Sequence, residues 1–172
     1  SIATLSILVT VGTVMIYGLC RLGIGYVASF SVVALILTRP VLLPQFTVNA
    51  GLLMVSAVIC WHLFARQNNK GALVVGCLLA FFSYLVRSQE FLLVLFVALP
   101  LLPWRALLFR QTAKIALLAL ILGITVSAFV DHQAYQANEW ELFNELNLVR
   151  AAFTDFGAVT QLIQRPDILE KK

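Results

Sequence analysis

Six apolar runs dominate the first 130 residues, and two of them reach the length of a membrane-spanning helix. A span needs about 20 residues, within a range of about 17–25. The runs 2–20 and 44–65 reach that length, and the shorter ones are 23–38, 71–86, 91–104 and 115–130. The run 91–104 is the weakest candidate, because Pro100 and Pro103 interrupt its second half. The 172-residue chain is 61% hydrophobic and 12% charged, whereas soluble domains are nearer 45–50% apolar and 25% charged. We therefore predict an all-α fold, a polytopic helical membrane bundle with about six spans or re-entrant helices.

The stretch from Ser83 to Glu90 decides how these runs are connected. Glu90 is the only acidic residue among the first 130, and Arg87 precedes it by three positions, so on a helix the two side chains would share a face. The stretch is either a polar turn between two spans or an ion pair buried within one. A single helix over 71–102 would be about 48 Å long, against a hydrocarbon core of about 30 Å. We therefore predict a turn, although the stretch contains neither Gly nor Pro.

Lys and Arg residues are concentrated in alternate connections between the runs. If all six runs span, one set of connections carries six basic residues and the opposite set carries two. Cytoplasmic loops are enriched in Lys and Arg, so the first set is predicted to be cytoplasmic. The opposite connections, which include a predicted loop at Arg39-Pro40, are then extracytoplasmic, as is everything after Val130. The cytoplasmic set is Arg21, Arg66, Lys70, Arg105, Arg110 and Lys114.

Composition changes abruptly after Val130. Residues 131–172 carry seven acidic and four basic residues, whereas residues 1–130 carry one acidic and eight basic. We therefore predict a transmembrane region at 1–130 and an extracytoplasmic helical segment at 131–172, the start of a longer part. Asn138 is suited to cap a helix over 138–153, which we expect to dock on the membrane region. The chain begins inside an apolar run, so we also expect it to be a fragment.

Two sets of polar residues are candidate ligand-binding sites. Arg87 and Glu90 would act on an anionic headgroup or a coupling proton, because ionisable residues at membrane depth are usually functional. The alternative is a turn at the membrane interface with a weak mutual ion pair. Asn147, Arg150 and Asp155 would bind a sugar or phosphate at the outer surface. The alternative there is an Arg–Asp tie within the tail.

Further polar residues lie near the ends of the third run. His62 is either a proton relay or an interfacial histidine. Gln45, Thr47 and Asn49 either line a cavity or serve the start of a helix and its hydrogen bonds to neighbouring helices.

Several common catalytic and nucleotide-binding motifs are absent from the sequence. The sequence contains no HExxH, no nucleotide-binding P-loop, no GxSxG and no GxGxxG, so no catalytic residue, cofactor or metal site is indicated. Cys20, Cys60 and Cys77 fall in apolar segments without CxxC spacing and are interpreted as small buried hydrophobes. The positive charge is loop charge at a membrane face, which argues against a nucleic-acid partner. The lipid bilayer is the expected environment.

A spaced set of aromatic and polar residues follows the last apolar run: Tyr135, Trp140, Phe143, Asn147, Arg150, Asp155 and Phe156. This set resembles a block in uncharacterised bacterial polytopic membrane proteins of surface-polysaccharide loci, which are similar in layout to polyprenyl-phosphate-dependent glycosyltransferases of the GT-C architecture. Gln45-Phe46-Thr47 is similar to a segment of the same proteins, so the resemblance covers about residues 44–172.

The resemblance implies a role in cell-envelope glycan assembly. The chain would then be part of a membrane protein that handles lipid-linked sugars at the outer face of a bacterial inner membrane, with a polyprenyl-phosphate-linked sugar and the rest of its own chain or partner subunits as partners. GT-C enzymes carry an acidic residue in their first outer loop, and no Asp or Glu precedes Glu90 here. Catalysis would therefore lie outside this fragment. The alternatives are a transporter or flippase subunit, or a structural membrane subunit without chemistry.

Overall fold

Helices dominate the part of the chain that the computed structural model describes, residues 2–42, 45–134 and 146. No strand occurs among these residues, which confirms the all-α prediction. The chain divides into two compact units, residues 1–127 and 128–172. The described residues of the second unit are the end of the last helix and Leu146, so the fold presented below is that of the first unit. The helix predicted at 138–153 lies outside the described residues.

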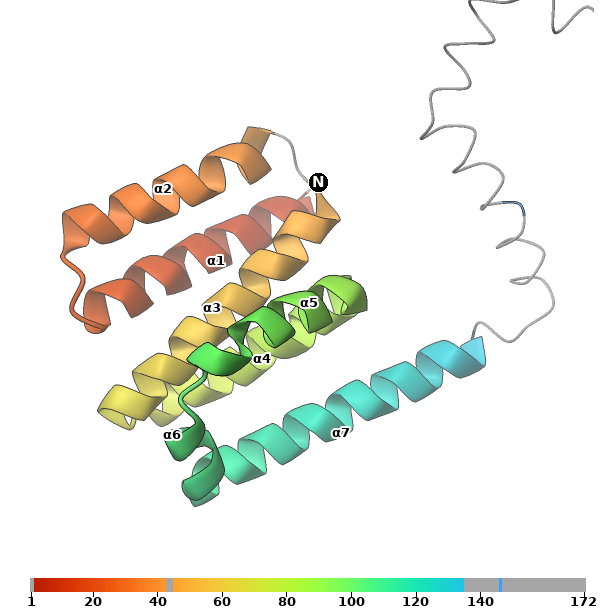
Figure 1. Ribbon diagram of the computed structural model, residues 1–172. Helices are drawn as coiled ribbons and strands as arrows, with labels where there is room; N and C mark the ends of the chain where they lie inside the picture. The colour runs from red at the N-terminus through yellow and green to blue at the C-terminus, as the bar shows by residue number, and fades with distance from the viewer. Residues whose placement is uncertain (1, 43–44, 135–145, 147–172) are drawn as a thin grey trace, which may run out of the picture. The chain divides into compact units, whose positions relative to one another are not determined.

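Each predicted run contains one helix, except that the run 91–104 is divided. Pro100 lies in a short 3₁₀ turn and Pro103 precedes the next helix, because proline lacks a backbone donor and interrupts a continuous helix. The fifth run is therefore not one straight helix. The elements are α1 (Ile2–Arg21), α2 (Tyr26–Leu42), α3 (Phe46–Gln67), α4 (Lys70–Val86), α5 (Ser88–Ala98), η1 (Leu99–Leu101), α6 (Trp104–Phe109) and α7 (Gln111–Ala134) (Figure 1).

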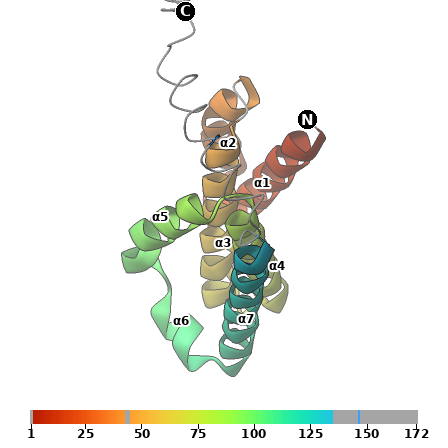
Figure 2. The ribbon, with the colours of Figure 1, turned by 90° about the vertical axis from the view of Figure 1, so that its right-hand side faces the viewer.

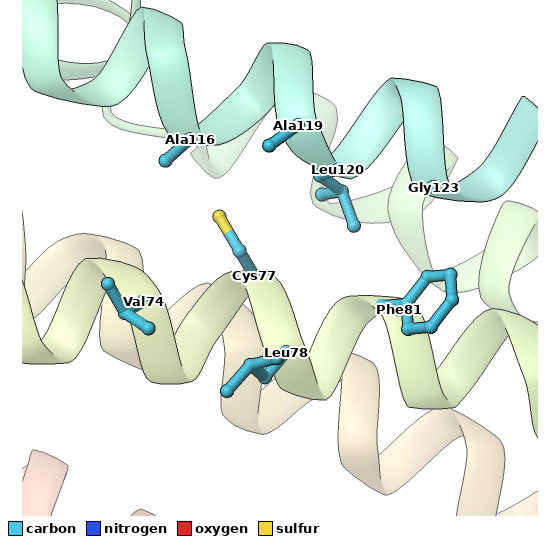
Figure 3. Close-up of a pocket in the computed structure, with 8 residues that line it drawn as sticks. All are labelled: Val74, Cys77, Leu78, Phe81, Ala116, Ala119, Leu120 and Gly123. Atoms are coloured by element: carbon cyan, nitrogen blue, oxygen red, sulfur yellow. The ribbon is translucent and has the colours of Figure 1, made fainter.

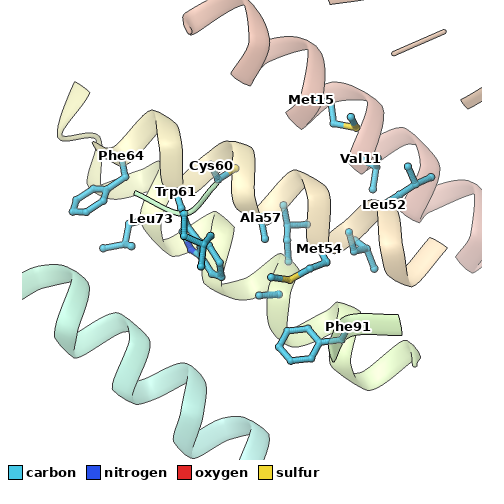
Figure 4. Close-up of a cluster of buried hydrophobic side chains, with 14 of the residues drawn as sticks. Val11, Met15, Leu52, Met54, Ala57, Cys60, Trp61, Phe64, Leu73 and Phe91 are labelled. Carbon is cyan, nitrogen blue, oxygen red and sulfur yellow. The ribbon is translucent and has the colours of Figure 1, made fainter. Parts of the chain in front are cut away.

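Helix α3 forms the centre of the first unit. Helices α1, α4 and α5 pack against α3, while α2 packs against α1 (Figures 1 and 2). In α3, 56% of the membrane-length segment is buried, compared with 33% in α1 and 11% in α7. Met54, Ala57 and Phe64 have no exposed surface and belong to the apolar cluster that joins α3 to its neighbours (Figure 4). The positions of the surrounding helices therefore depend on α3.

Glycines allow close contact between α3 and two of these neighbours. Gly76 of α4 lies against Trp61, and a Cβ at this glycine would be 2.8 Å from the indole Cδ1. Gly18 of α1 lies against Ile59 in the same way. Small residues in membrane helices let backbones approach, so that dispersion contacts and interhelical hydrogen bonds form. The scattered glycines of the sequence are thus partly explained by packing on α3.

The helix ends fall into two groups. At the ends of α1 and α3, Arg21 Nη2 donates to Gln67 Oε1 at 3.0 Å, and Gln67 Nε2 donates to the Arg21 carbonyl at 2.7 Å. Beside them, Arg66 Nη1 donates to the Leu22 carbonyl at 3.0 Å. We call this the Arg66 end of the bundle. The opposite end, where α1 and α3 begin and α4 gives way to α5 at Arg87, is called the Arg87 end.

The chain returns to the Arg66 end through α5 and η1. The segment from Leu102 to Ala106 lines a cavity together with Ala65, near the end of α3. Arg110 donates to the carbonyl of the same residue, Ala65, at 3.1 Å. Helix α7 begins at this end, and its residue Gly123 lies against Phe81 of α4. Successive long elements therefore alternate in direction, as a bundle of membrane passes would.

Three helices are long and apolar enough to cross a membrane: α1, the segment Thr47–Gln67 of α3, and α7. The apolar segments 26–42, 70–86 and 88–101 are shorter. Large apolar side chains face outward on several helices, for example Phe30 at 63% exposure and Phe96 at 75%. Apolar surface of this kind is favourable in lipid and unfavourable in water. These features support a helical membrane protein, while the count of six crossings and their sidedness stay predictions.

Two predicted connections have opposite outcomes. The turn at Arg87 is confirmed, because α4 ends at Val86 and α5 begins at Ser88. The loop predicted at Arg39-Pro40 is wrong, because α2 continues through both residues to Leu42. Pro40 is buried, and packing against neighbouring helices lets membrane helices tolerate an interior proline. Helix α7 also runs to Ala134, beyond the region boundary predicted at residue 130.

Candidate functional site

Arg87 is the single extended residue between α4 and α5, and it forms the corner between the two helices. Its φ and ψ are −164° and 104°, which any residue adopts without strain. Its N–H donates to the Ser83 carbonyl at 3.1 Å, and its own carbonyl accepts from the Phe91 N–H at 3.1 Å. The rings of Tyr84 and Phe91 meet edge to face across the corner, with centroids 5.7 Å apart. The turn therefore needs neither Gly nor Pro, because Arg87 serves the end of one helix and the start of the next.

The Arg87 side chain is held by α3 more than by Glu90. Its Nη1 donates to Thr47 Oγ1 in the first turn of α3. Its Nε lies 3.9 Å from Glu90 Oε1, and the two side chains are 46% and 23% exposed. That distance exceeds a hydrogen bond, and exposed pairs contribute about 0–1 kcal/mol. Arg87 is thus an oriented cation whose remaining N–H groups are available to an anion.

Two buried polar side chains, those of Ser83 and Asn49, lie on the helices that Arg87 joins through its contact with Thr47. Ser83 Oγ donates to the Ala50 carbonyl at 2.7 Å and joins α4 to α3 in the protein interior. Asn49 has no exposed surface, and neither its amide nitrogen nor its amide oxygen has a hydrogen-bond partner among the described residues. An unpaired buried amide costs about 1–3 kcal/mol. Thr47 thus makes a hydrogen bond to a neighbouring helix, one of the two alternatives for these residues, and Asn49 is a buried amide without a partner among the described residues.

A long groove runs between α1 and α4 over the surface of α3. It consists of two adjoining cavities of about 380 and 300 Å³ that share Val75. One cavity reaches Val86, directly before Arg87, and the other reaches Gly71 near the Arg66 end. At 1.5 Å per residue the groove therefore follows about 22 Å of α4. Its α4 side therefore ends at Val86, one residue before Arg87.

Hydroxyl side chains make up four of the seven α1 residues that line this groove. Three of them, those of Ser6, Thr10 and Thr13, donate to carbonyl oxygens four residues earlier in α1. Their donors are thus satisfied within the helix, and the small side chains leave space beside α4. Sequence reasoning missed this face, although its spacing of four, three and four residues is visible. The four residues are Ser6, Thr10, Thr13 and Tyr17.

A second groove, between α4 and α7, is apolar throughout. Its volume is about 340 Å³, and small residues of α7, Ala116, Ala119 and Gly123, face Val74 and Phe81 of α4 (Figure 3). Besides Cys77, every side chain that lines it is a hydrocarbon. The groove therefore offers space for packing and no chemistry of its own.

The remaining candidates do not join the Arg87 site. His62 lies partly buried in α3 near the Arg66 end, and Gln45 precedes α3 without a side-chain capping bond. Cys60 is buried, Cys20 and Cys77 are partly buried, and all three are free thiols. Within the described ranges no group of His, Cys, Asp and Glu is arranged to hold a metal ion.

The tail candidates Asn147, Arg150 and Asp155 lie outside the described residues. The structure therefore brings Arg87 and Glu90 together and does not test the tail set.

Comparisons of the chain with protein-family models, with curated proteins and with solved structures found no match. The resemblance to polysaccharide-locus membrane proteins therefore stays a prediction from the sequence.

Proposed function

We propose that the chain is part of a membrane protein that handles lipid-linked sugars in cell-envelope glycan assembly, at the outer face of a bacterial inner membrane. The observation that carries the proposal is the placement of Arg87. Its side chain is 46% exposed and oriented by Thr47, and Arg87 directly follows Val86, which lines the end of the α1/α4 groove. A cation one residue beyond the end of a largely apolar groove suits a ligand with a phosphate at one end and a long hydrocarbon chain behind it.

The length of the groove favours a polyprenyl chain over an ordinary acyl chain. One leaflet of the hydrocarbon core is about 15 Å thick, half of about 30 Å. The groove follows about 22 Å of α4, from Gly71 to Val86. A chain that fills it must pass the bilayer midplane, and the chains of ordinary phospholipids end there. Three of the four hydroxyls that line the groove donate to carbonyls within α1, so these three donors need no partner from the occupant.

A transferase would draw its catalytic residues from elsewhere in the assembly. The described residues contain two acidic side chains, Glu90 and Asp131. Glu90 forms a weak ion pair with Arg87. In this proposal Arg87 binds the phosphate and Glu90 limits the freedom of Arg87. Neither is assigned a catalytic step.

A transporter or flippase is the second candidate, and Asn49 is the observation that favours it. Its buried, unpaired amide lies on α3 two residues after Thr47, where a polar group passing through the bundle would find a partner. Transport of a sugar lipid across proteoliposome membranes distinguishes the candidates. Loss of transport in Asn49→Leu would support a flippase, and absence of transport by the wild type would exclude it.

Binding of a polyprenyl-phosphate-linked sugar to the purified chain in detergent tests the leading proposal. We expect Arg87→Gln to bind at least about tenfold more weakly, because hydrogen bonds to charged groups contribute about 1.5–3 kcal/mol. Arg39→Gln is the matched control, since Arg39 is an exposed cation at the same end of the bundle. A phosphate lipid whose chain is only one leaflet long should bind more weakly than the polyprenyl lipid. Wild-type binding by Arg87→Gln would remove Arg87 from the site and refute the proposal.

A further inference from the structure

A cavity of about 540 Å³ lies at the Arg66 end, the opposite end of the bundle from the Arg87 site. It opens between Ala65 of α3 and the segment from Leu102 to Ala106, and Arg110 closes one side. Two of its lining residues, Arg105 and Arg110, are cations, and none is acidic. The grooves between α1 and α4 and between α4 and α7 contain no charged lining residue. This cavity therefore differs from those grooves in its electrostatics.

Arg110 is fixed in place by the end of α3. Its Nη1 donates to the Phe64 carbonyl and to Asn68 Oδ1, each at 3.0 Å, and its Nη2 donates to the Ala65 carbonyl at 3.1 Å. The guanidinium also lies 5.0 Å from the centre of the Phe64 ring. Three of the five N–H groups of an arginine are thus used. The hydrogen bonds to α3 hold the guanidinium in a fixed position, so its two remaining N–H groups are already oriented to bind an anion.

Arg105 is the opposite case, a cation without protein partners. Its side chain is exposed, and it makes no hydrogen bond or ion pair within the described part of the chain. Residues 1–127 contain eight basic residues and one acidic residue, Glu90, which lies at the Arg87 end. No acidic side chain of this unit therefore neutralises the cavity.

The surroundings of the cavity are those of a segment at a membrane surface. Phe109 is 79% exposed and Leu101 is 66% exposed, so both need an apolar environment. The indole N–H of Trp104 donates to the Leu99 carbonyl at 2.9 Å, which orients its ring. Trp at the interface, cations beside it and exposed apolar side chains are typical of membrane-interface elements. An occupant with both an anionic group and hydrocarbon matches this combination.

We propose that this cavity binds the headgroup phosphate of an anionic phospholipid. Arg105 and the two remaining N–H groups of Arg110 contact the phosphate oxygens, and the acyl chains lie along Leu101 and Phe109. A free phosphate or nucleotide would use the cations and leave both apolar side chains in water, so a lipid accounts for more of the site. The inference does not depend on the function proposed for the Arg87 end.

Native mass spectrometry of the full chain in detergent, with dioleoylphosphatidylglycerol or dioleoylphosphatidylcholine added, tests the inference. We expect the wild type to retain phosphatidylglycerol in preference to phosphatidylcholine. Arg105→Gln should bind phosphatidylglycerol about fivefold more weakly, the factor that corresponds to about 1 kcal/mol for one cation near a lipid surface. Arg39→Gln removes an exposed cation from the other end of the bundle and should leave binding unchanged.

Several results would overturn the inference. Equal retention of the two lipids, or wild-type binding by Arg105→Gln, would exclude a headgroup site in this cavity. An equal loss in Arg39→Gln would show that total charge, not the cavity, attracts the lipid. Displacement of the lipid by inorganic phosphate would assign the site to a free anion. Neither the Arg39 nor the Arg105 side chain makes a hydrogen bond in the described structure, so both variants should keep the melting temperature of the wild type. An unchanged melting temperature excludes misfolding as the cause of weaker binding.

Discussion

Replacing Arg110 with methionine tests how the connection before α7 is held to the end of α3. The substitution keeps an unbranched apolar stem of similar length and removes all donors. Its three acceptors are affected differently. The Phe64 carbonyl keeps a bond from the Asn68 N–H at 2.8 Å, and Asn68 Oδ1 is exposed and can turn to water. Only the partly buried carbonyl of Ala65 loses the partner that Arg110 supplied.

The expected cost follows from these differences. A partly buried carbonyl left unpaired costs about 1–3 kcal/mol, and loss of the cation–π contact with Phe64 adds about 0.5–1 kcal/mol. We therefore expect Arg110→Met to lower the free energy of unfolding by about 1.5–4 kcal/mol. For a chain of this size, each kcal/mol changes the melting temperature by about 2–4 °C, so the expected decrease is about 3–16 °C.

Thermal unfolding of the purified chain in detergent, followed by tryptophan fluorescence, measures this decrease. Lys114→Met is the matched control, because Lys114 is an exposed cation near the start of α7 whose side chain makes no hydrogen bond in the described structure. Surface substitutions of this kind change stability by about 0.5 kcal/mol or less. If Arg110→Met melts at the same temperature as Lys114→Met, the hydrogen bonds to α3 do not hold this connection and the reasoning fails.

Three further substitutions probe packing, burial and the Arg87 corner. Gly76→Ala should lower the free energy of unfolding by about 1–3 kcal/mol, because its Cβ would overlap Trp61. Gly51→Ala, whose Cβ meets only an ordinary contact at 3.7 Å, should leave the free energy of unfolding unchanged or raise it. Equal melting temperatures of the two variants would contradict the close packing of α4 on α3. Asn49→Leu should raise stability by about 1–3 kcal/mol by removing an unpaired buried amide, and a clear loss in chemical unfolding would reveal a partner for it. Glu90→Gln should change the melting temperature by no more than a few degrees, because its partner nitrogen is 3.9 Å away and half exposed; a large loss would mean that the pair is enclosed.

The positions of the helices were predictable where length and charge act locally. The turn at Arg87 follows from the length of the two runs and from the thickness of a membrane, without any turn-forming residue. The interruption of the fifth run follows from Pro100 and Pro103. The loop predicted at Arg39-Pro40 failed because the rule applied to proline neglects packing. Pro40 is buried, and α2 continues past it.

The features that depend on tertiary contacts were not predictable in the same way. Arg110 was counted only as loop charge, because nothing in the sequence indicates that it reaches carbonyls 45 and 46 positions earlier. The hydroxyl face of α1 is visible as a spacing, but its meaning depends on α1 and α4 lying on either side of α3. Thr47 was a candidate for a cavity wall, and its contact with Arg87 across 40 positions needed the fold.

Sidedness of the Arg87 end is the central claim, because a lipid-linked sugar at the outer face is accessible to Arg87 only if that end faces outward. Gln89 and Gln111 are exposed residues at opposite ends of the bundle. In a background with Cys20, Cys60 and Cys77 replaced by alanine, each is changed to cysteine and intact cells are treated with an impermeant thiol reagent. Gln89→Cys should be labelled in intact cells, and Gln111→Cys only after permeabilisation. Labelling of Gln111→Cys but not Gln89→Cys in intact cells would contradict the account.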